Sequence, residues 1–210
     1  MSASTGMAKV RAKPYHHGDL KAALIDGALE LIAERGVRSF SVAEVSRRLG
    51  VTAAAPYRHF ADRDELLAAV AVRALRAFGD ALAGRSSAAD PPEQRLAAMA
   101  SGYVRFAAEQ PALFGVVFGV GLDKKRRYPE LRRAYEEVEA LVAGCVTELC
   151  PGDAAGADHL ADAIEASAHG YAALLTDSPG PPDPADVDRA AEQAARTTRA
   201  LIRGRAALSG

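Results

Sequence analysis

Residues 41–60 carry two helix signals separated by a single glycine, and this pairing constrains the fold more than any other feature of the chain. Ser41 and Glu44 match the S-x-x-E capping box, in which each side chain accepts a hydrogen bond from the other residue's backbone N–H. Apolar residues follow at helical spacing as far as Gly50, which favours a helix stop. Thr52 is placed to cap a second, short helix that reaches Tyr57 or His59. Helix, tight glycine turn and short helix together predict a helix-turn-helix.

Similar signals flank this segment. A first helix fits residues 19–35, with Asp19 as its N-cap and Gly36 as its stop, and a further helix begins at Asp62, where Glu65 completes a D-x-x-E pattern. Residues 1–63 hold ten Lys and Arg against six Asp and Glu, a formal charge of +4, whereas the whole chain has −1 and the remainder therefore −5. A basic head on an acidic body is typical of a polyanion-binding unit joined to a non-binding one.

The predicted short helix has a surface suited to a DNA groove. Residues 53–55 are alanines, which allow close approach of the backbone, and the polar side chains of Tyr57 and Arg58 follow them. Pro56 lies inside this helix, where it removes about one backbone hydrogen bond, so we expect a helix with a bent or tightened axis. Arg63, in the first turn of the next helix, opposes the helix dipole and fits better beside a phosphate.

The segment 41–67, SVAEVSRRLGVTAAAPYRHFADRDELL, resembles the signature of the TetR family of repressors. Its Gly-Val-Thr turn and the aromatic-x-x-Phe ending from Tyr57 to Phe60 carry the resemblance, which extends closely over about 50 residues. The resemblance implies that one set of residues holds phosphates, another lies nearest the bases, and Ser41 belongs to the same surface. The phosphate set is Thr52, Tyr57, His59 and Arg63, and the base set is Ala53, Ala55 and Arg58.

The N-terminal arm, residues 1–18, is basic and contains Lys9, Arg11, Lys13, Tyr15, His16 and His17. Two interpretations stay open for it: an arm that lies along a DNA groove, or a solvated tail. Nothing near the two histidines completes a metal or catalytic site.

The remainder, residues 64–210, shows apolar residues at three- and four-residue spacing and no alternating strand pattern, so the predicted fold is all-α. We expect a three-helix DNA-binding domain at residues 19–63 and a larger helical domain at residues 64–210 for effector binding and dimerisation. No apolar run approaches the length of a membrane span and no signal-peptide pattern is present, which predicts a cytoplasmic protein.

Catalytic signatures are missing from the sequence. Phosphate-binding loops, dinucleotide fingerprints, nucleophile elbows and zinc-type spacings are absent, and Cys145 and Cys150 stand alone. The sequence therefore predicts no enzyme, no cofactor and no metal. Two rivals remain: a helical enzyme that uses Glu165 and His169, and an adaptor or nucleoid protein without sequence preference.

Large and aromatic side chains concentrate on a few helices of the body. They line either an apolar effector cavity or an ordinary core, and the family resemblance favours the cavity. His169 and Gly170 resemble the His-Gly pair of a TetR subgroup whose C-terminal domain is named for Trp, His and Gly; the chain has no Trp, and Glu165 stands near that position. Glu165 lies one turn before His169 and can pair with it. The candidate ligand-binding residues are Met99, Tyr103, Phe106, Phe114, Phe118, Tyr135, His169 and Tyr171.

Small residues form two ridges on the last two predicted helices. They suit close helix packing in a homodimer, or are surface alanines of an alanine-rich chain. With the resemblance, the sequence predicts a repressor that a small apolar or aromatic effector releases from a palindromic double-stranded DNA operator. The ridge residues are Ala163, Ala166, Gly170 and Ala173 on one helix, and Ala190, Ala191, Ala194 and Ala195 on the other.

Overall fold

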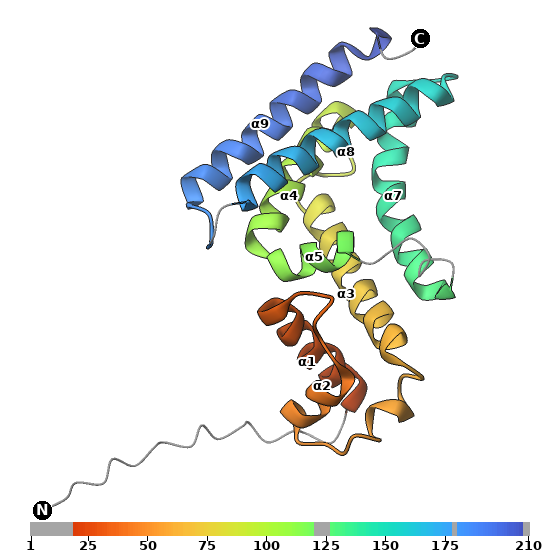
Figure 1. The fold of residues 1–210 in the computed structure, drawn as a ribbon. Helices are drawn as coiled ribbons and strands as arrows, with labels where there is room; N and C mark the ends of the chain where they lie inside the picture. Colours follow the sequence, from red (N-terminus) through yellow and green to blue (C-terminus); the bar gives the residue numbers. More distant parts are fainter. Residues whose placement is uncertain (1–18, 120–126, 178–179, 208–210) are drawn as a thin grey trace, which may run out of the picture.

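The computed structural model describes residues 19–119, 127–177 and 180–207, and every regular element within those ranges is helical, which confirms the all-α prediction (Figure 1). The predicted arm, with its basic and histidine residues, lies outside the described residues. The elements are α1 (Leu20–Arg35), α2 (Val42–Leu49), η1 (Pro56–Arg58), α3 (Arg63–Ala83), α4 (Pro92–Glu109), α5 (Pro111–Gly119), α7 (Pro129–Leu149), α8 (Ala154–Thr176), α9 (Pro184–Arg203) and η2 (Arg205–Ala207).

The helix that opens the predicted helix-turn-helix begins and ends where the sequence indicates. Ser41 Oγ accepts a hydrogen bond from Glu44 N at 3.3 Å and caps α2, and Gly50 ends the helix with a φ of 67°. This left-handed conformation favours glycine because it has no Cβ. The capping box also predicts that the Glu44 side chain accepts a hydrogen bond from the backbone N–H of Ser41, and this part of the prediction is wrong. The Glu44 carboxylate instead binds Arg35 and Arg47, which draw it away from the Ser41 backbone.

The segment after α2 differs from the predicted short α-helix. It consists of tight turns and the single 3-10 turn η1, and no side chain caps η1, so the N-cap role predicted for Thr52 is wrong. The backbone N–H of Ala55 donates to Thr52 O at 3.0 Å, and that of His59 donates to Pro56 O at 2.9 Å. Because Pro56 has no N–H, it cannot make the four-residue bond back to Thr52 that an α-helix requires. The predicted tightening of the axis is confirmed, but as a 3-10 turn.

Helix α3 connects the two ends of the molecule. It begins a few residues after the η1 turn, beside α1, and continues upward into the body, where it packs against α4, α5 and α7 (Figure 1). Apolar side chains that recur along α3 at helical spacing are buried over its whole length: Leu66, Leu67, Val70, Ala74, Phe78 and Leu82.

Helix α4 packs against α3, α7, α8 and α9 and is the central element of the body. Its approach to α3 depends on Gly102: a Cβ placed there would lie 2.5 Å from the carbonyl oxygen of Ala81. The backbones of α3 and α4 therefore touch, and displacement of one helix is transmitted to the other.

The two predicted ridges of small residues have different surroundings. On α9, Ala191, Ala194 and Ala195 are buried within this chain, where α9 packs on α4 and α8, so this ridge serves the chain's own core. On α8, Ala166 and Ala173 are exposed, and a Cβ added at Gly170 would meet no atom within 4 Å. Only the α8 ridge is open at the surface.

Candidate nucleic-acid interface and ligand cavity

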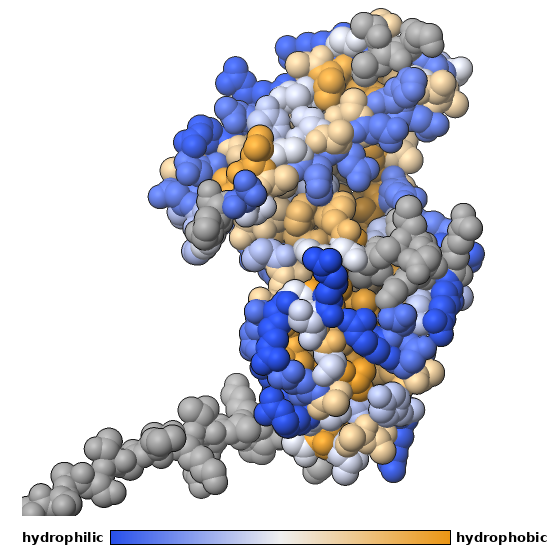
Figure 2. Space-filling model, viewed as in Figure 1, coloured by the Kyte–Doolittle hydropathy of each residue, from blue (hydrophilic) through white to orange (hydrophobic). Residues whose placement is uncertain are grey.

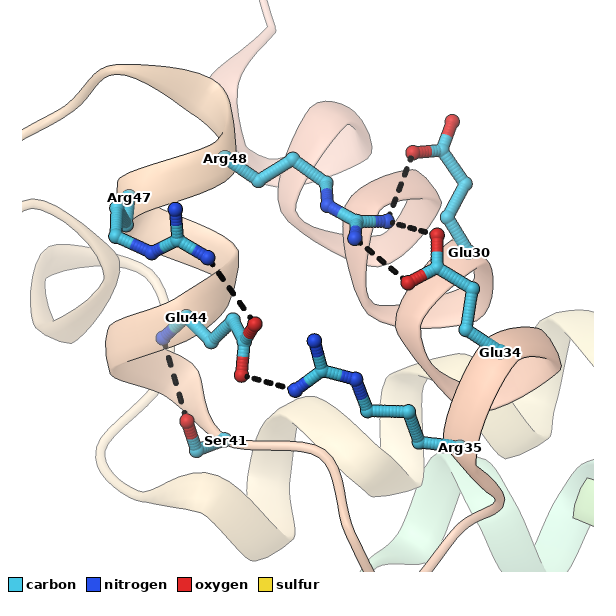
Figure 3. A network of polar contacts seen from close by, with 7 residues as sticks. All are labelled: Glu30, Glu34, Arg35, Ser41, Glu44, Arg47 and Arg48. Atoms are coloured by element: carbon cyan, nitrogen blue, oxygen red, sulfur yellow. Dashed lines mark hydrogen bonds and ion pairs between the residues drawn. The ribbon is translucent and has the colours of Figure 1, made fainter.

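Charged side chains join α1 to α2 (Figure 3). The Arg48 guanidinium binds both carboxylate oxygens of Glu34, each at 2.7 Å, and lies 3.8 Å from Glu30, while Arg35 binds Glu44 at 2.9 Å. The hydrogen bond from Arg48 lowers the pKa of Glu34 below its ordinary value, and the positive charges of Arg48 and Arg35 lower it further. These effects outweigh desolvation, which alone would raise the pKa. Because these bonds engage Arg48, it positions α2 against α1 and is less available to a nucleic acid.

The residues after α2 form an exposed surface, which we call the 52–59 turn. Thr52, Ala53, Tyr57, Arg58 and His59 are exposed, with 57% of the Tyr57 surface open to solvent. Within the described residues, no hydrogen bond or ion pair involves the side chains of the last three. A phenol, a guanidinium and an imidazole therefore point outward together, and these are groups that bind phosphate oxygens and base edges.

Two buried residues hold the 52–59 turn in place. Pro56 is buried at the start of η1, and Phe60, directly after the turn, is 4% exposed. Lys21 of α1 lies over the ring of Phe60 at 5.9 Å from the centroid. The turn is thus fixed from beneath while its outer side chains stay free. Of the other predicted interface residues, Ala55 is half-buried, and Ser41 is exposed with its hydroxyl engaged in the α2 cap.

Arg63 makes intramolecular contacts that the sequence did not predict. Its Nε donates to Phe40 O at 3.1 Å, its Nη2 donates to Val37 O at 3.0 Å, and its guanidinium lies 4.4 Å above the Phe40 ring. These bonds join the start of α3 to the connection between α1 and α2. The phosphate contact that the resemblance implies stays a prediction, and the geometry gives Arg63 a positioning role.

A cavity of about 650 Å³ lies in the body, with walls from α3, α4, α5, α7 and α8. Such a volume is in the range of small-molecule sites. Figure 2 shows apolar surface below α8 and beside α7, bordered by polar surface along α8. Four of the eight predicted ligand-binding residues line the cavity: Met99, Tyr103, Phe118 and Tyr135.

The other four predicted residues lie outside the cavity wall. Phe106 packs on Phe78 with ring centroids 5.2 Å apart. Phe114 stacks on His169 at 5.8 Å, and the hydroxyl of Tyr171 bonds to Thr197 at 3.0 Å and joins α8 to α9. Helical spacing could not distinguish these structural contacts from cavity contacts, because both place a side chain inward.

His169 is paired with Tyr103, whose hydroxyl lies 2.8 Å from the imidazole Nδ1. No ion pair joins Glu165 to His169 within the described residues, so the pairing that their one-turn spacing allows is not formed, and the histidine bonds to Tyr103 instead. Burial raises the pKa of Tyr103, and the negative charge of Glu165 raises it further. The phenol therefore keeps its proton and remains a neutral hydrogen-bonding group in the cavity wall.

Several lining residues were missed as ligand contacts. The apolar ones on α3 and α7 recur at helical spacing, and this pattern indicates burial without showing whether protein or empty space faces the side chain. The four acidic residues at the wall resemble ordinary solvent-facing charges in the sequence. The missed residues include Leu75, Phe78, Leu82, Val138, Val142 and Val146, together with Glu139, Asp158, Asp162 and Glu165.

A polar contact links the beginnings of α3 and α7. The Asp62 carboxylate caps α3 by accepting from Glu65 N at 2.8 Å, and it also binds Arg127 at 2.9 Å and Tyr128 at 3.5 Å. The backbone hydrogen bond from Glu65 and the charge of Arg127 lower the pKa of Asp62. Because α7 also lines the cavity, this contact joins a cavity wall to the helix that carries the 52–59 turn.

Across residues 19–119, 127–177 and 180–207, no three His, Cys, Asp or Glu side chains lie close enough to hold a metal ion. None of the helices in these ranges combines the length and the apolar character that crossing a lipid bilayer requires.

These features define a two-lobed, all-helical protein with a helix-turn-helix at one end and a cavity in the other lobe. The family model for bacterial regulatory proteins of the tetR family matches residues 24–70, and the model for the tetracyclin repressor-like C-terminal domain matches residues 96–198. The chain belongs to the TetR family of bacterial regulatory proteins.

Individual relatives agree with this assignment. The chain is 30% identical over 172 residues to the HTH-type transcriptional regulator BetI of Rhizobium meliloti, covering 81% of this chain and 76% of that protein. It is 31% identical over 104 residues to BetI of Brucella canis, and this match spans only about half the length of each protein. A solved structure of a protein with unknown function from Rhodococcus sp. RHA1 is 28% identical, with a TM-score of 0.67 and coverage of 92% of this chain and 98% of that one.

Proposed function

We propose that this protein is a DNA-binding transcriptional repressor, acting as a homodimer in the cytoplasm and released from a palindromic operator by a small molecule bound in the cavity. The observation that carries the proposal is the exposed 52–59 turn, placed at the start of the same helix, α3, whose second half lines the cavity. One rigid element therefore connects a surface suited to DNA with a space suited to a ligand.

The length of α3 gives this connection a mechanical consequence. Arg63 and Phe78 are fifteen residues apart, which is about 22 Å along a helix at 1.5 Å per residue. A tilt of about 10° at the cavity end would displace the 52–59 turn by roughly 4 Å. A shift of this size alters the separation of two recognition turns that must meet successive major grooves about 34–36 Å apart.

The open ridge of α8 supports dimerisation. Small residues there allow a second helix to approach closely, and Leu174, at the end of the same helix, is 79% exposed. The polar outer face of α9 lies beside this ridge, since α8 and α9 pack together. We therefore propose a symmetric interface through the outer faces of α8 and α9 in which α8 contributes the apolar part.

Effector release requires that the ligand distinguish two conformations. A ligand in the cavity contacts both α3 and α7, and the two helices are joined at their N-terminal ends by Asp62 and Arg127. Separation of α3 from α7 would strain this contact, so filling the cavity would favour a different tilt of α3. The contact between α3 and α4 at Gly102 would carry the same displacement into the rest of the body.

The experiment compares Arg58→Ala with Arg132→Ala on a candidate palindrome from the DNA that flanks the gene and on an unrelated duplex. Fluorescence anisotropy should show that the wild-type protein prefers the palindrome by about 10³-fold or more. Arg58→Ala should lose about tenfold or more on the palindrome and little on the unrelated duplex, because a base contact is removed. Arg132, exposed on α7, carries the same charge outside the proposed interface, so its variant should retain wild-type binding.

Equal losses on both duplexes would contradict a base contact by Arg58. A wild-type protein without preference would instead support a nucleoid or adaptor role. Arg58 is a better test than Arg63, because truncating Arg63 would also break its bonds to the carbonyl groups of Val37 and Phe40.

A further inference from the structure

The cavity wall has two chemically different parts. One part is apolar and contains four aromatic rings, those of Phe78, Tyr103, Phe118 and Tyr135. The other part holds four acidic side chains, and the lining contributed by the described residues includes no Lys, Arg or His. The formal charge of this lining is therefore −4. The acidic residues are Glu139 of α7 and Asp158, Asp162 and Glu165 of α8.

The four carboxylates are exposed and form a part of the cavity wall that we call the mouth, and no side chain of the described residues neutralises them. No ion pair or hydrogen bond in the described parts of the chain involves any of them, whereas carboxylates elsewhere, such as those of Glu34 and Asp62, bind arginines. The three on α8 recur at four- and three-residue spacing and thus share one helix face. Like charges so arranged repel one another, and a bound cation would relieve that repulsion.

The acidic mouth acts electrostatically on the rings below it. Burial raises the pKa of Tyr103, with a further contribution from Glu165, and burial raises the pKa of Tyr135, with a further contribution from Glu139. Both phenols therefore remain neutral, and both experience the negative potential of the mouth. Aromatic faces themselves attract cations, so rings and carboxylates favour the same sign of charge.

We infer that the cavity binds an organic cation with a large apolar body, its positive group at the acidic mouth and its body among the aromatic rings. The inference names the ligand class of the site on which the proposed function depends. A small cation could contact only a minor part of the wall of a cavity of about 650 Å³, so a ligand that fills this cavity must also have a large apolar body. Within the described residues no three acidic groups converge as a metal site does, which favours a diffuse organic charge over a metal ion.

Isothermal titration calorimetry of the full chain, without DNA, tests this inference with probes whose apolar chains are nearly equal in length. Octyltrimethylammonium and octanol have eight-carbon chains, octanoate has a seven-carbon chain on its carboxylate, and tetramethylammonium is the cationic head without the chain. Octyltrimethylammonium should bind at least tenfold more tightly than octanoate, with octanol between them and tetramethylammonium weakest. Raising the salt concentration from about 0.1 M to 1 M should narrow the difference between the charged probes, because the Debye length falls from about 10 Å to about 3 Å.

A pair of double variants separates the mouth from general surface charge. Asp162→Asn with Glu165→Gln removes two charges from the mouth, whereas Glu136→Gln with Glu137→Gln removes two exposed charges of α7 outside the cavity wall. The mouth variant should bind octyltrimethylammonium about 5- to 10-fold more weakly and octanoate more tightly, while the control stays within about twofold of wild type. Unchanged circular dichroism and Tm establish that both variants are folded.

Three results would overturn the inference: octanoate binding as tightly as the cation, no measurable binding of any octyl probe, or equal effects of the two double variants. Each is independent of operator binding, since no DNA is present. If the cation binds as expected but leaves the operator complex intact, the ligand class stands and the proposed effector release fails. If the protein shows no operator preference, the repressor proposal fails while the calorimetric result is unaffected.

Discussion

Replacement of Gly102 by alanine tests the close contact between α3 and α4. The added Cβ would lie 2.5 Å from the carbonyl oxygen of Ala81, so α3 and α4 must separate before the methyl group fits. Overpacking against a backbone atom lowers the free energy of unfolding by about 3 kcal/mol at the upper end of the usual range. The higher helix propensity of alanine raises it by about 1 kcal/mol. We expect a net loss of about 2 kcal/mol, which lowers the Tm by roughly 4–8 °C in a chain of this size.

Gly144→Ala is the matched control. Gly144 lies inside α7, is exposed, and has no atom within 4 Å of an added Cβ, so the same substitution should raise the Tm by roughly 2–4 °C through helix propensity alone. Differential scanning calorimetry at equal protein concentration measures both shifts, since dimerisation makes the Tm depend on concentration. An increase in Tm for both variants would refute the close contact of α3 with α4.

Further predictions concern polar contacts. Tyr103→Phe leaves Nδ1 of His169 without its partner and should cost about 1–2 kcal/mol, or roughly 3–6 °C in Tm. Arg48→Ala should lower the urea midpoint at low salt and less so in 1 M NaCl, because an ion pair between α1 and α2 is lost. Because the folded pKa of Asp62 is lowered, its contribution to stability is complete above its ordinary pKa near 4 and is lost as the pH falls through the lowered value. Urea melts between about pH 2 and 5 should therefore show a weaker pH dependence for Asp62→Asn, and an identical dependence would exclude this assignment.

The helix boundaries of the first lobe followed from local chemistry and could be predicted. Asp19 and Ser41 have side chains that accept hydrogen bonds from nearby backbone N–H groups, and Gly36 and Gly50 adopt positive φ angles at low cost. These interactions span only a few residues, so the sequence alone determines them. The sequence also indicates that Pro56 alters the short helix, but the predicted bend or tightening is smaller than the observed change from an α-helix to a 3-10 turn. Too few residues follow Pro56 for an α-helix to form beyond it.

The missed features depend on contacts between distant residues. His169 bonds to Tyr103, which lies 66 positions earlier, and the sequence offered only the neighbouring Glu165 as a partner. The alanines of α9 were expected at a subunit interface, but small residues favour close packing within a chain as well as between chains. The acidic mouth could not be recognised because an exposed carboxylate beside a cavity has the same sequence environment as one facing bulk water.

Site-specific photocrosslinking at the 52–59 turn tests the central claim, that this turn lies in a DNA groove, most directly. A benzoylphenylalanine in place of the exposed Tyr57 would be irradiated on the bound operator, with the same group in place of the exposed Glu137 of α7 as the control. The proposed dimer should give crosslinks at two positions about one helical turn, roughly 10 base pairs, apart, and none from the control. Equal crosslinking from both positions, or none from position 57 on DNA that the protein demonstrably binds, would contradict the claim.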